Sequence, residues 1–166
     1  MPSSVAGIGP ELHPDIEPLA FLLGTWVGGG TGEYPTIASF GYREEIRFWH
    51  IGKPYIAYTH SAWGLDDGRP MHGETGFLRL PGGAVAVELV VAHPNGIAEV
   101  SVGTIDGHRL RLRSTAVTAA PTAKRHDAVA RAIDVDGDVL RYTLEMAAVG
   151  QPLVIHLAAT LRRRSP

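Results

Sequence analysis

The stretch GTWVGGG, residues 24–30, decides which fold this chain of 166 residues is expected to adopt. An apolar stripe at helical spacing precedes it over residues 15–23, with Asp15 as the expected N-cap. Gly24 is a common stop signal at the end of a helix, and the helical period is lost after it. The glycines allow a first strand to bend sharply or another backbone to approach it closely. No Gly-Lys-Ser/Thr follows and no helix begins there, so a phosphate-binding loop is excluded.

Downstream of this stretch, turn signals recur at short and regular intervals, beginning at Gly32 and including Pro81-Gly82-Gly83 and Asp106-Gly107. Such punctuation is typical of antiparallel strands joined by hairpins. We expect ten strands, at residues 25–31, 38–50, 54–63, 71–80, 84–92, 97–104, 109–117, 126–135, 138–148 and 152–162. Ten strands after one short helix close best as an up-and-down barrel, because closure removes exposed edges.

The predicted fold is therefore all-β: a ten-stranded antiparallel up-and-down β-barrel with a short N-terminal helix. Residues 1–14 are expected to be a flexible leader, and residues 15–164 a single domain. A barrel of this size is wide enough to hold a ligand.

Composition narrows the chemistry that such a ligand site can use. The chain has no cysteine and eight histidines, which excludes thiolate metal sites and cysteine nucleophiles and leaves histidine as the candidate ligand of a metal or haem. A net charge of −2 provides no basic field for nucleic acid. No apolar run is long enough to span a bilayer, and no signal peptide is recognised, so a cytoplasmic protein without membrane or nucleic-acid partners is expected.

His156 is the first candidate for chemistry, in the last predicted strand. Strand periodicity places Ile155 and the leucines on one face and His156 on the other, between Val154 and Ala158. One interpretation is a hydrogen-bonded interior or surface histidine. The other is an axial ligand of haem iron, because small neighbours leave a flat space beside a neutral imidazole.

His72 is the second candidate, since it opens a strand directly after Met71. The pair forms either an ordinary strand end with a core methionine or the wall of a pocket opposite the first ligand. The remaining six histidines are expected to be surface or packing residues. His50 and His60 lie on neighbouring predicted strands, but their spacing is not that of a zinc motif. Glu44 and Glu45 look like part of an alternation of surface and core.

Several strings of the sequence resemble, in order, those of a known family. Gly-x-Trp after a short helix is similar to lipocalins and fatty-acid-binding proteins, in which the tryptophan closes one end of the barrel, as we expect for Trp26. The whole set resembles the nitrobindin family over about residues 22–163. The matching strings are GTWVGGG (24–30), YPTI (34–37), FGYREE (40–45), GKP (52–54), PMHGETG (70–76), PTAK (121–124) and HLAA (156–159).

This resemblance implies a ten-stranded barrel that binds haem b in a wide, solvent-open cleft. It implies His156 as the iron ligand, Met71 and His72 on the distal side, and Thr36 and Lys124 near the haem rim. The family binds nitric oxide at ferrous haem and converts peroxynitrite to nitrate at ferric haem. A haem-dependent peroxynitrite isomerase is therefore the expected enzyme, with peroxynitrite and nitric oxide as its small-molecule ligands.

Two other interpretations of the residues stay open. A carrier of fatty acid or another apolar ligand would need an interior carboxylate anchor, for which Arg111, Arg141 and Tyr142 qualify only if they point inward. A homodimer is also expected, because the last strand has apolar residues on both faces between Leu153 and Leu161. Dimerisation is compatible with the haem enzyme.

Overall fold

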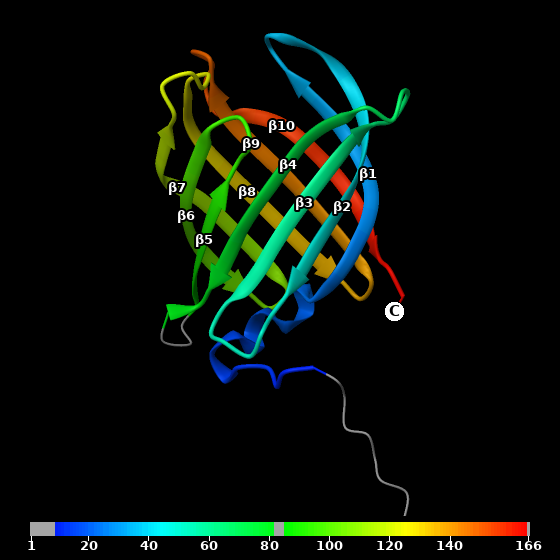
Figure 1. The fold of residues 1–166 in the computed structure, drawn as a ribbon, viewed down its shortest axis with the longest axis vertical. Helices are drawn as coiled ribbons and strands as arrows, with labels where there is room; N and C mark the ends of the chain where they lie inside the picture. Colours follow the sequence, from blue (N-terminus) through cyan, green and yellow to red (C-terminus); the bar gives the residue numbers. More distant parts are fainter. Residues whose placement is uncertain (1–8, 82–84, 166) are drawn as a thin grey trace, which may run out of the picture.

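A computed structural model describes residues 9–81 and 85–165, and over these residues the chain forms one closed antiparallel barrel preceded by a short helix (Figure 1). The predicted all-β fold class is confirmed. The strands follow one another around the barrel in sequence order, and β1 pairs with β10 to close it. The elements are η1 (Pro14–Leu22), β1 (Gly24–Tyr34), β2 (Ile37–Trp49), β3 (Ile56–Gly64), β4 (Pro70–Arg79), β5 (Ala86–Ala92), β6 (Ile97–Asp106), β7 (Arg109–Ala119), β8 (His126–Asp136), β9 (Val139–Ala148) and β10 (Val154–Arg163).

Parts of three predictions lie outside the described residues. These are residues 1–8 of the expected leader, residues 82 and 83 of the expected turn, and residue 84 at the start of an expected strand. Within the described part of the leader, Leu12 packs against the hydrophobic core. The assignment of residues 1–14 as a leader and 15–164 as one domain stays a prediction.

The helix η1 and Trp26 close one end of the barrel, which we call the closed end. The Trp26 side chain is fully buried, and its indole Nε1 donates a hydrogen bond to the Leu22 carbonyl oxygen over 2.7 Å. The guanidinium carbon of Arg163 lies 4.1 Å from the centroid of the Trp26 ring. The expected role of Trp26 is confirmed. In Figure 1, η1 lies beneath the strands at this end.

The helix itself differs from the prediction, because it is a 3-10 helix with His13 and not Asp15 as its N-cap. The Asp15 backbone N–H donates to His13 Nδ1. The ring of Pro18 inside the segment would clash with the carbonyl of Pro14 in an α-helix, which disfavours α-helical winding here.

The glycines of β1 allow the barrel to close. A Cβ atom at Gly28 or Gly30 would overlap the carbonyl oxygen of Thr160 or Ala158 on β10, so the expected close approach of backbones is confirmed. The predicted turn at Gly32 is wrong: β1 continues to Tyr34, and the Phe40 ring occupies the space where a Gly32 side chain would stand.

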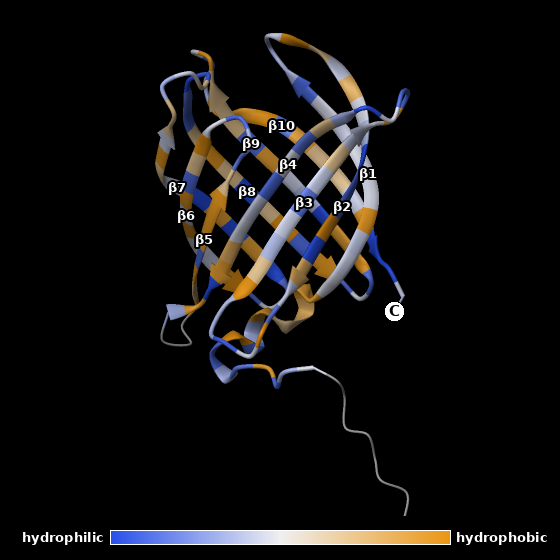
Figure 2. Ribbon diagram, in the orientation of Figure 1, coloured by the Kyte–Doolittle hydropathy of each residue, from blue (hydrophilic) through white to orange (hydrophobic). Residues whose placement is uncertain are grey.

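The interior changes in character along the barrel axis. Apolar side chains dominate near the closed end, as the orange strand segments beside η1 show (Figure 2). Five buried polar or charged side chains interrupt this pattern: Glu44, His60, Glu99, Ser101 and Arg131. The turns that join β1 to β2, β3 to β4, β5 to β6, β7 to β8 and β9 to β10 define the opposite, open end. No helix within residues 9–81 and 85–165 is long and apolar enough to cross a membrane.

Replacing Gly30 by alanine tests the seam between β1 and β10. We expect Gly30→Ala to lower the free energy of unfolding by about 1–3 kcal/mol, because the new methyl group displaces the β10 backbone and not a flexible side chain. Denaturant unfolding measures this loss. Gly73→Ala is the matched control, since its Cβ would lie at an ordinary contact distance of 3.4 Å from the His60 carbonyl oxygen. Equal stabilities of the two variants would contradict this account.

Candidate functional site

A cavity of about 540 Å³ occupies the interior toward the open end of the barrel. This volume lies within the range of about 300–1,000 Å³ that is typical of small-molecule sites. Five histidines line the cavity, which corrects the expectation that only two of the eight would do so. They are His60, His72, His93, His126 and His156.

His156 reaches this cavity through an irregularity in β10. Ile155 pairs with Glu145 and Leu157 pairs with Leu144, so His156 is the extra residue of a β-bulge. His156 and Leu157 therefore both line the cavity, whereas simple alternation placed them on opposite faces. The bulge brings Leu157 to the cavity, whereas Val154 and Ala158, the neighbours of His156 in the expected alternation, are not among the residues that line it.

The hydrogen bond of His156 fixes the tautomer of its imidazole ring. Nδ1 lies 3.0 Å from the Glu33 carbonyl oxygen, which can only accept, so Nδ1 carries the proton. In the neutral ring, Nε2 then keeps a lone pair. A carbonyl partner at one ring nitrogen is the usual arrangement around a metal-ligating histidine.

Two aromatic rings support the orientation of His156. Their centroids lie 5.3 Å (Tyr34) and 6.2 Å (Phe40) from the His156 centroid, both edge to face. The buried Tyr34 is itself anchored, because its hydroxyl accepts a hydrogen bond from the Ala148 N–H over 2.8 Å and lies 3.1 Å from the Met146 carbonyl oxygen, to which it donates. The rotation of the candidate ligand is therefore restricted by β1, β2 and β9 together.

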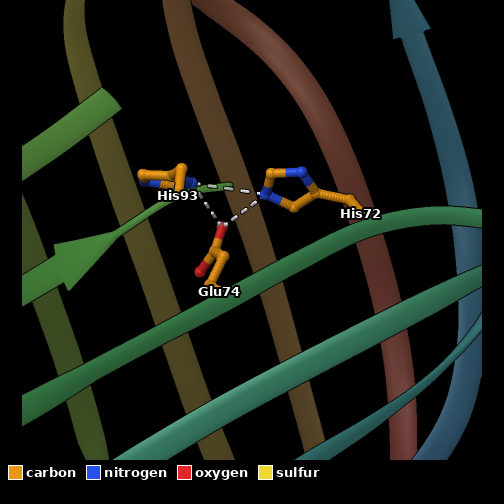
Figure 3. A group of neighbouring side chains, drawn as sticks. All are labelled: His72, Glu74 and His93. Atoms are coloured by element: carbon orange, nitrogen blue, oxygen red, sulfur yellow. Dashed lines mark hydrogen bonds and ion pairs between the residues drawn. The ribbon is translucent and has the colours of Figure 1, made fainter. Parts of the chain in front are cut away.

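A second group of side chains gathers around His72. Its Nε2 lies 3.3 Å from His93 Nδ1 and 3.4 Å from Glu74 Oε1, and the last two atoms are 3.6 Å apart. Figure 3 shows these three side chains converging on one point. His72 and Glu74 come from β4, and His93 follows the end of β5. Met71 also lines the cavity and is partly exposed at its mouth.

Arg131 holds two buried carboxylates next to this group. Its guanidinium forms ion pairs with Glu99 and, over 3.5 Å, with Glu74, whose Oε2 also accepts a 2.8 Å hydrogen bond from the Tyr58 hydroxyl. Burial disfavours charged carboxylates, but Arg131 and the neighbouring histidines outweigh it. They hold the pKa of Glu74 well below its ordinary value of 4.5 and also lower the pKa of Glu99.

A third buried carboxylate, Glu44, lies deeper in the barrel. His60 Nε2 is 2.6 Å from it, and the Tyr142 hydroxyl donates to it over 2.9 Å. Glu44 thus faces the interior, and only Glu45 takes the surface position of the predicted alternation. His60 stands opposite Ile46 in the β2–β3 register. His50 follows the end of β2 and accepts a hydrogen bond from the Gly52 N–H. The two histidines therefore do not face each other across the two strands.

The carboxylate anchor of a fatty-acid carrier is not assembled from the expected residues. Arg111 is exposed and forms an ion pair with Asp134 over 2.7 Å, and Arg141 is also exposed. Only Tyr142 points inward, where it bonds Glu44 and Tyr42. Burial and Glu44 raise the pKa of Tyr142, which keeps its proton and serves as a donor.

The two remaining predicted site residues lie in turns at the open end. Thr36 is exposed between β1 and β2, and Lys124 is exposed between β7 and β8. Neither is among the residues that line the cavity, so their expected place near a haem rim stays a prediction.

Sequence reasoning missed the buried Glu99 and Arg131 and the partly buried His93. Alternation along the strands could have found them. Val91 in β5 and Val129 in β8 are buried and stand two residues before His93 and Arg131, which places each pair on one face. Charged side chains are usually exposed, so charge alone predicts a surface position. Glu99 and Arg131 break that rule because their opposite charges compensate each other inside the barrel.

Acid should destabilise this barrel through Glu74 and Glu99. Their lowered pKa values mean that the unfolded chain binds more protons, so their contribution to stability is present above about pH 4.5 and is lost as the pH falls through the folded-state values. We expect the free energy of unfolding to fall steeply below pH 4.5 in urea titrations. Glu99→Gln should be less stable at pH 7 and show a smaller fall. An unchanged slope in that variant would contradict the assignment.

Comparison with known proteins agrees with this geometry. Residues 15–163 match the family described as "THAP4-like, heme-binding beta-barrel domain". Peroxynitrite isomerase 2 of Mycobacterium avium (strain 104) is 49 % identical over 158 residues, which cover 93 % of this chain and 98 % of the relative. The peroxynitrite isomerase of Nocardia farcinica (strain IFM 10152) is 52 % identical over 167 residues, covering 97 % of this chain and 99 % of the relative.

A solved structure supports the same relationship. The crystal structure of Rv2717c from M. tuberculosis superposes with a TM-score of 0.87 at 46 % sequence identity, covering 93 % of this chain and all of that one. The family match over residues 15–163 spans every strand of the barrel. The chain therefore belongs to the family of THAP4-like, haem-binding β-barrel domains, the nitrobindin family.

Proposed function

We propose that this protein binds haem b in the open-end cavity, with His156 as the iron ligand, and isomerises peroxynitrite to nitrate. One observation carries the proposal: His156 Nδ1–H donates a hydrogen bond to the Glu33 carbonyl oxygen, which leaves Nε2 with a lone pair on a residue that lines a cavity of about 540 Å³. The relatives named peroxynitrite isomerase, about half identical to this chain, support the reaction.

The donor set and the walls of the cavity fit a haem. A neutral imidazole is the usual protein ligand of haem iron, and apolar side chains provide contacts for the macrocycle. The apolar lining includes Ile37, Phe40, Leu144 and Leu157. When bound, the ferric iron would supply a Lewis acid for the peroxynitrite anion, and the ferrous iron a site for nitric oxide.

The side chains of this protein divide the remaining tasks. His156 holds the group from β10, and the edge-on rings of Tyr34 and Phe40 keep its imidazole in place. His72 acts as a hydrogen-bond donor toward the substrate from β4, beside Met71. Thr36 and Lys124, in the rim turns, would contact the haem edge. Peroxynitrite and nitrate contain the same atoms and charge, so the conversion needs no electron donor.

A fatty-acid carrier is the less favoured function. The two arginines expected as anchors lie on the exposed surface, and the buried Arg131 is already paired with Glu74 and Glu99. Displacement of a fluorescent fatty acid without any binding of hemin would favour the carrier.

A cytoplasmic location and a homodimer complete the proposal. The side chain of Ile155, which the β10 bulge turns outward, is 49 % exposed and supports a contact between two copies. Light scattering of the purified protein should give twice the mass of the chain.

Hemin titration tests the iron ligand. We expect a Soret band in the wild type and at least a tenfold weaker affinity in His156→Ala, because the ligand bond is lost. His126→Gln is the matched control, since His126 lines the same cavity from β8 without taking part in the proposed site. The assignment is wrong if His156→Ala keeps the band and the affinity.

Stopped-flow decay of peroxynitrite tests the reaction. The ferric, haem-loaded protein should accelerate the decay with nitrate as product, and His72→Ala should slow it about 100-fold, the scale expected for one lost donor at a reaction centre. Hemin affinity of the same variant separates a catalytic effect from a loss of haem. Decay no faster than with the haem-free protein would refute the activity.

A further inference from the structure

We propose that His72, His93 and Glu74 form a site for a divalent transition-metal ion of the zinc class, separate from the iron ligand His156. Two imidazole nitrogens and one carboxylate oxygen are donors that zinc accepts in proteins. Within the residues that the structure describes, these three side chains form a group that could hold a metal ion (Figure 3).

The spacing of the three donor atoms fits one tetrahedral ion. Zinc bonds of about 2.0–2.2 Å in tetrahedral geometry hold two ligand atoms about 3.3–3.6 Å apart. The observed separations are 3.3 Å between His72 Nε2 and His93 Nδ1, 3.4 Å between His72 Nε2 and Glu74 Oε1, and 3.6 Å between His93 Nδ1 and Glu74 Oε1. The separations of the three donor atoms therefore match those around one tetrahedral ion.

When both imidazole rings are neutral, hydrogen bonds alone do not satisfy this group. His93 Nε2 lies 3.1 Å from the Glu99 carboxylate and donates a hydrogen bond to it, so His93 Nδ1 keeps a lone pair in the neutral ring. Glu74 Oε1 is also an acceptor. A single proton on His72 Nε2 can serve one of these two atoms and leaves the other without a donor. A cation at the common point satisfies all three.

The surroundings of the triangle are those of a supported metal site. Glu99 fixes the ring of His93 from behind, as carboxylates do for many metal-ligating histidines. The second oxygen of Glu74 is held by Tyr58 and Arg131. Glu74, Glu99 and Arg131 together carry a charge of −1, so a divalent ion leaves the pocket at only +1. The half-exposed His72 and the adjoining cavity give the ion and a water ligand access.

This inference does not rest on haem binding, but it bears on it. His72 Nε2 would be occupied by the ion and would no longer act as a donor toward a haem-bound ligand. We therefore expect any reaction to which His72 contributes to change in rate when an ion occupies the site.

Zinc binding to the haem-free full chain tests the site. With Zn²⁺ competed against a chromophoric chelator, we expect one ion per chain. Glu99→Gln should weaken binding about 10–100-fold as a supporting residue. His93→Ala and Glu74→Gln should weaken it further. His126→Gln and His156→Ala are the matched cavity controls and should bind as the wild type does. Thermal unfolding identifies any variant that fails to fold.

Cobalt gives a second readout that a merely structural role would not produce. Co²⁺ in the wild type should show the intense visible bands of tetrahedral coordination, and these should be lost in His93→Ala. Failure of the wild type to compete for zinc, or equal affinity in a folded His93→Ala, would overturn the inference. The haem proposal has its own outcome, because His156→Ala should lose hemin and keep zinc, whereas His93→Ala should lose zinc and keep hemin.

Discussion

Closure of the sheet depends on the absence of side chains along β1. The carbonyl oxygens of Thr160 and Ala158 on β10 occupy the space that Cβ atoms at Gly28 and Gly30 would need. With β10 seated this closely, its bulge at His156 falls beside the end of β1, where Glu33 and Tyr34 meet the imidazole. The glycine-rich strand therefore decides both the closure of the barrel and the location of its candidate ligand.

Inside the closed sheet, polarity is divided along the axis. The closed end is filled by Trp26, the helix and apolar side chains, which provide the stability of a continuous hydrophobic core. Toward the open end, Arg131 compensates Glu74 and Glu99, and those carboxylates in turn orient His72 and His93. Removing the arginine alone would leave two buried carboxylates without the cation that compensates them, so the polar set acts as a unit. The polar set around Arg131 is thus built onto a barrel whose closed end is apolar.

The sequence predicted most of the architecture because its signals are local. Turn residues, strand alternation and the Gly-x-Trp pattern indicated ten strands, the closing pair of the barrel and the plug at Trp26. It also identified His156 and His72 as cavity residues. The features that it missed depend on contacts between distant residues. The bulge in β10 turns Leu157 toward the cavity, and the charges of the buried Glu99 and Arg131 are compensated by partners on other strands. His93 directly follows the end of β5. Its contact with His72 and Glu74 on β4 depends on the register between β4 and β5, which the sequence alone does not give.

The bond between His156 and the Glu33 carbonyl oxygen joins residues 123 positions apart. β10 is the last strand of the barrel to leave the ribosome, and β1 is the first. The candidate ligand is therefore oriented only when synthesis of the whole barrel is complete and its two outermost strands have met. Under the proposed role of His156, a prosthetic group would therefore be loaded after translation and not during it.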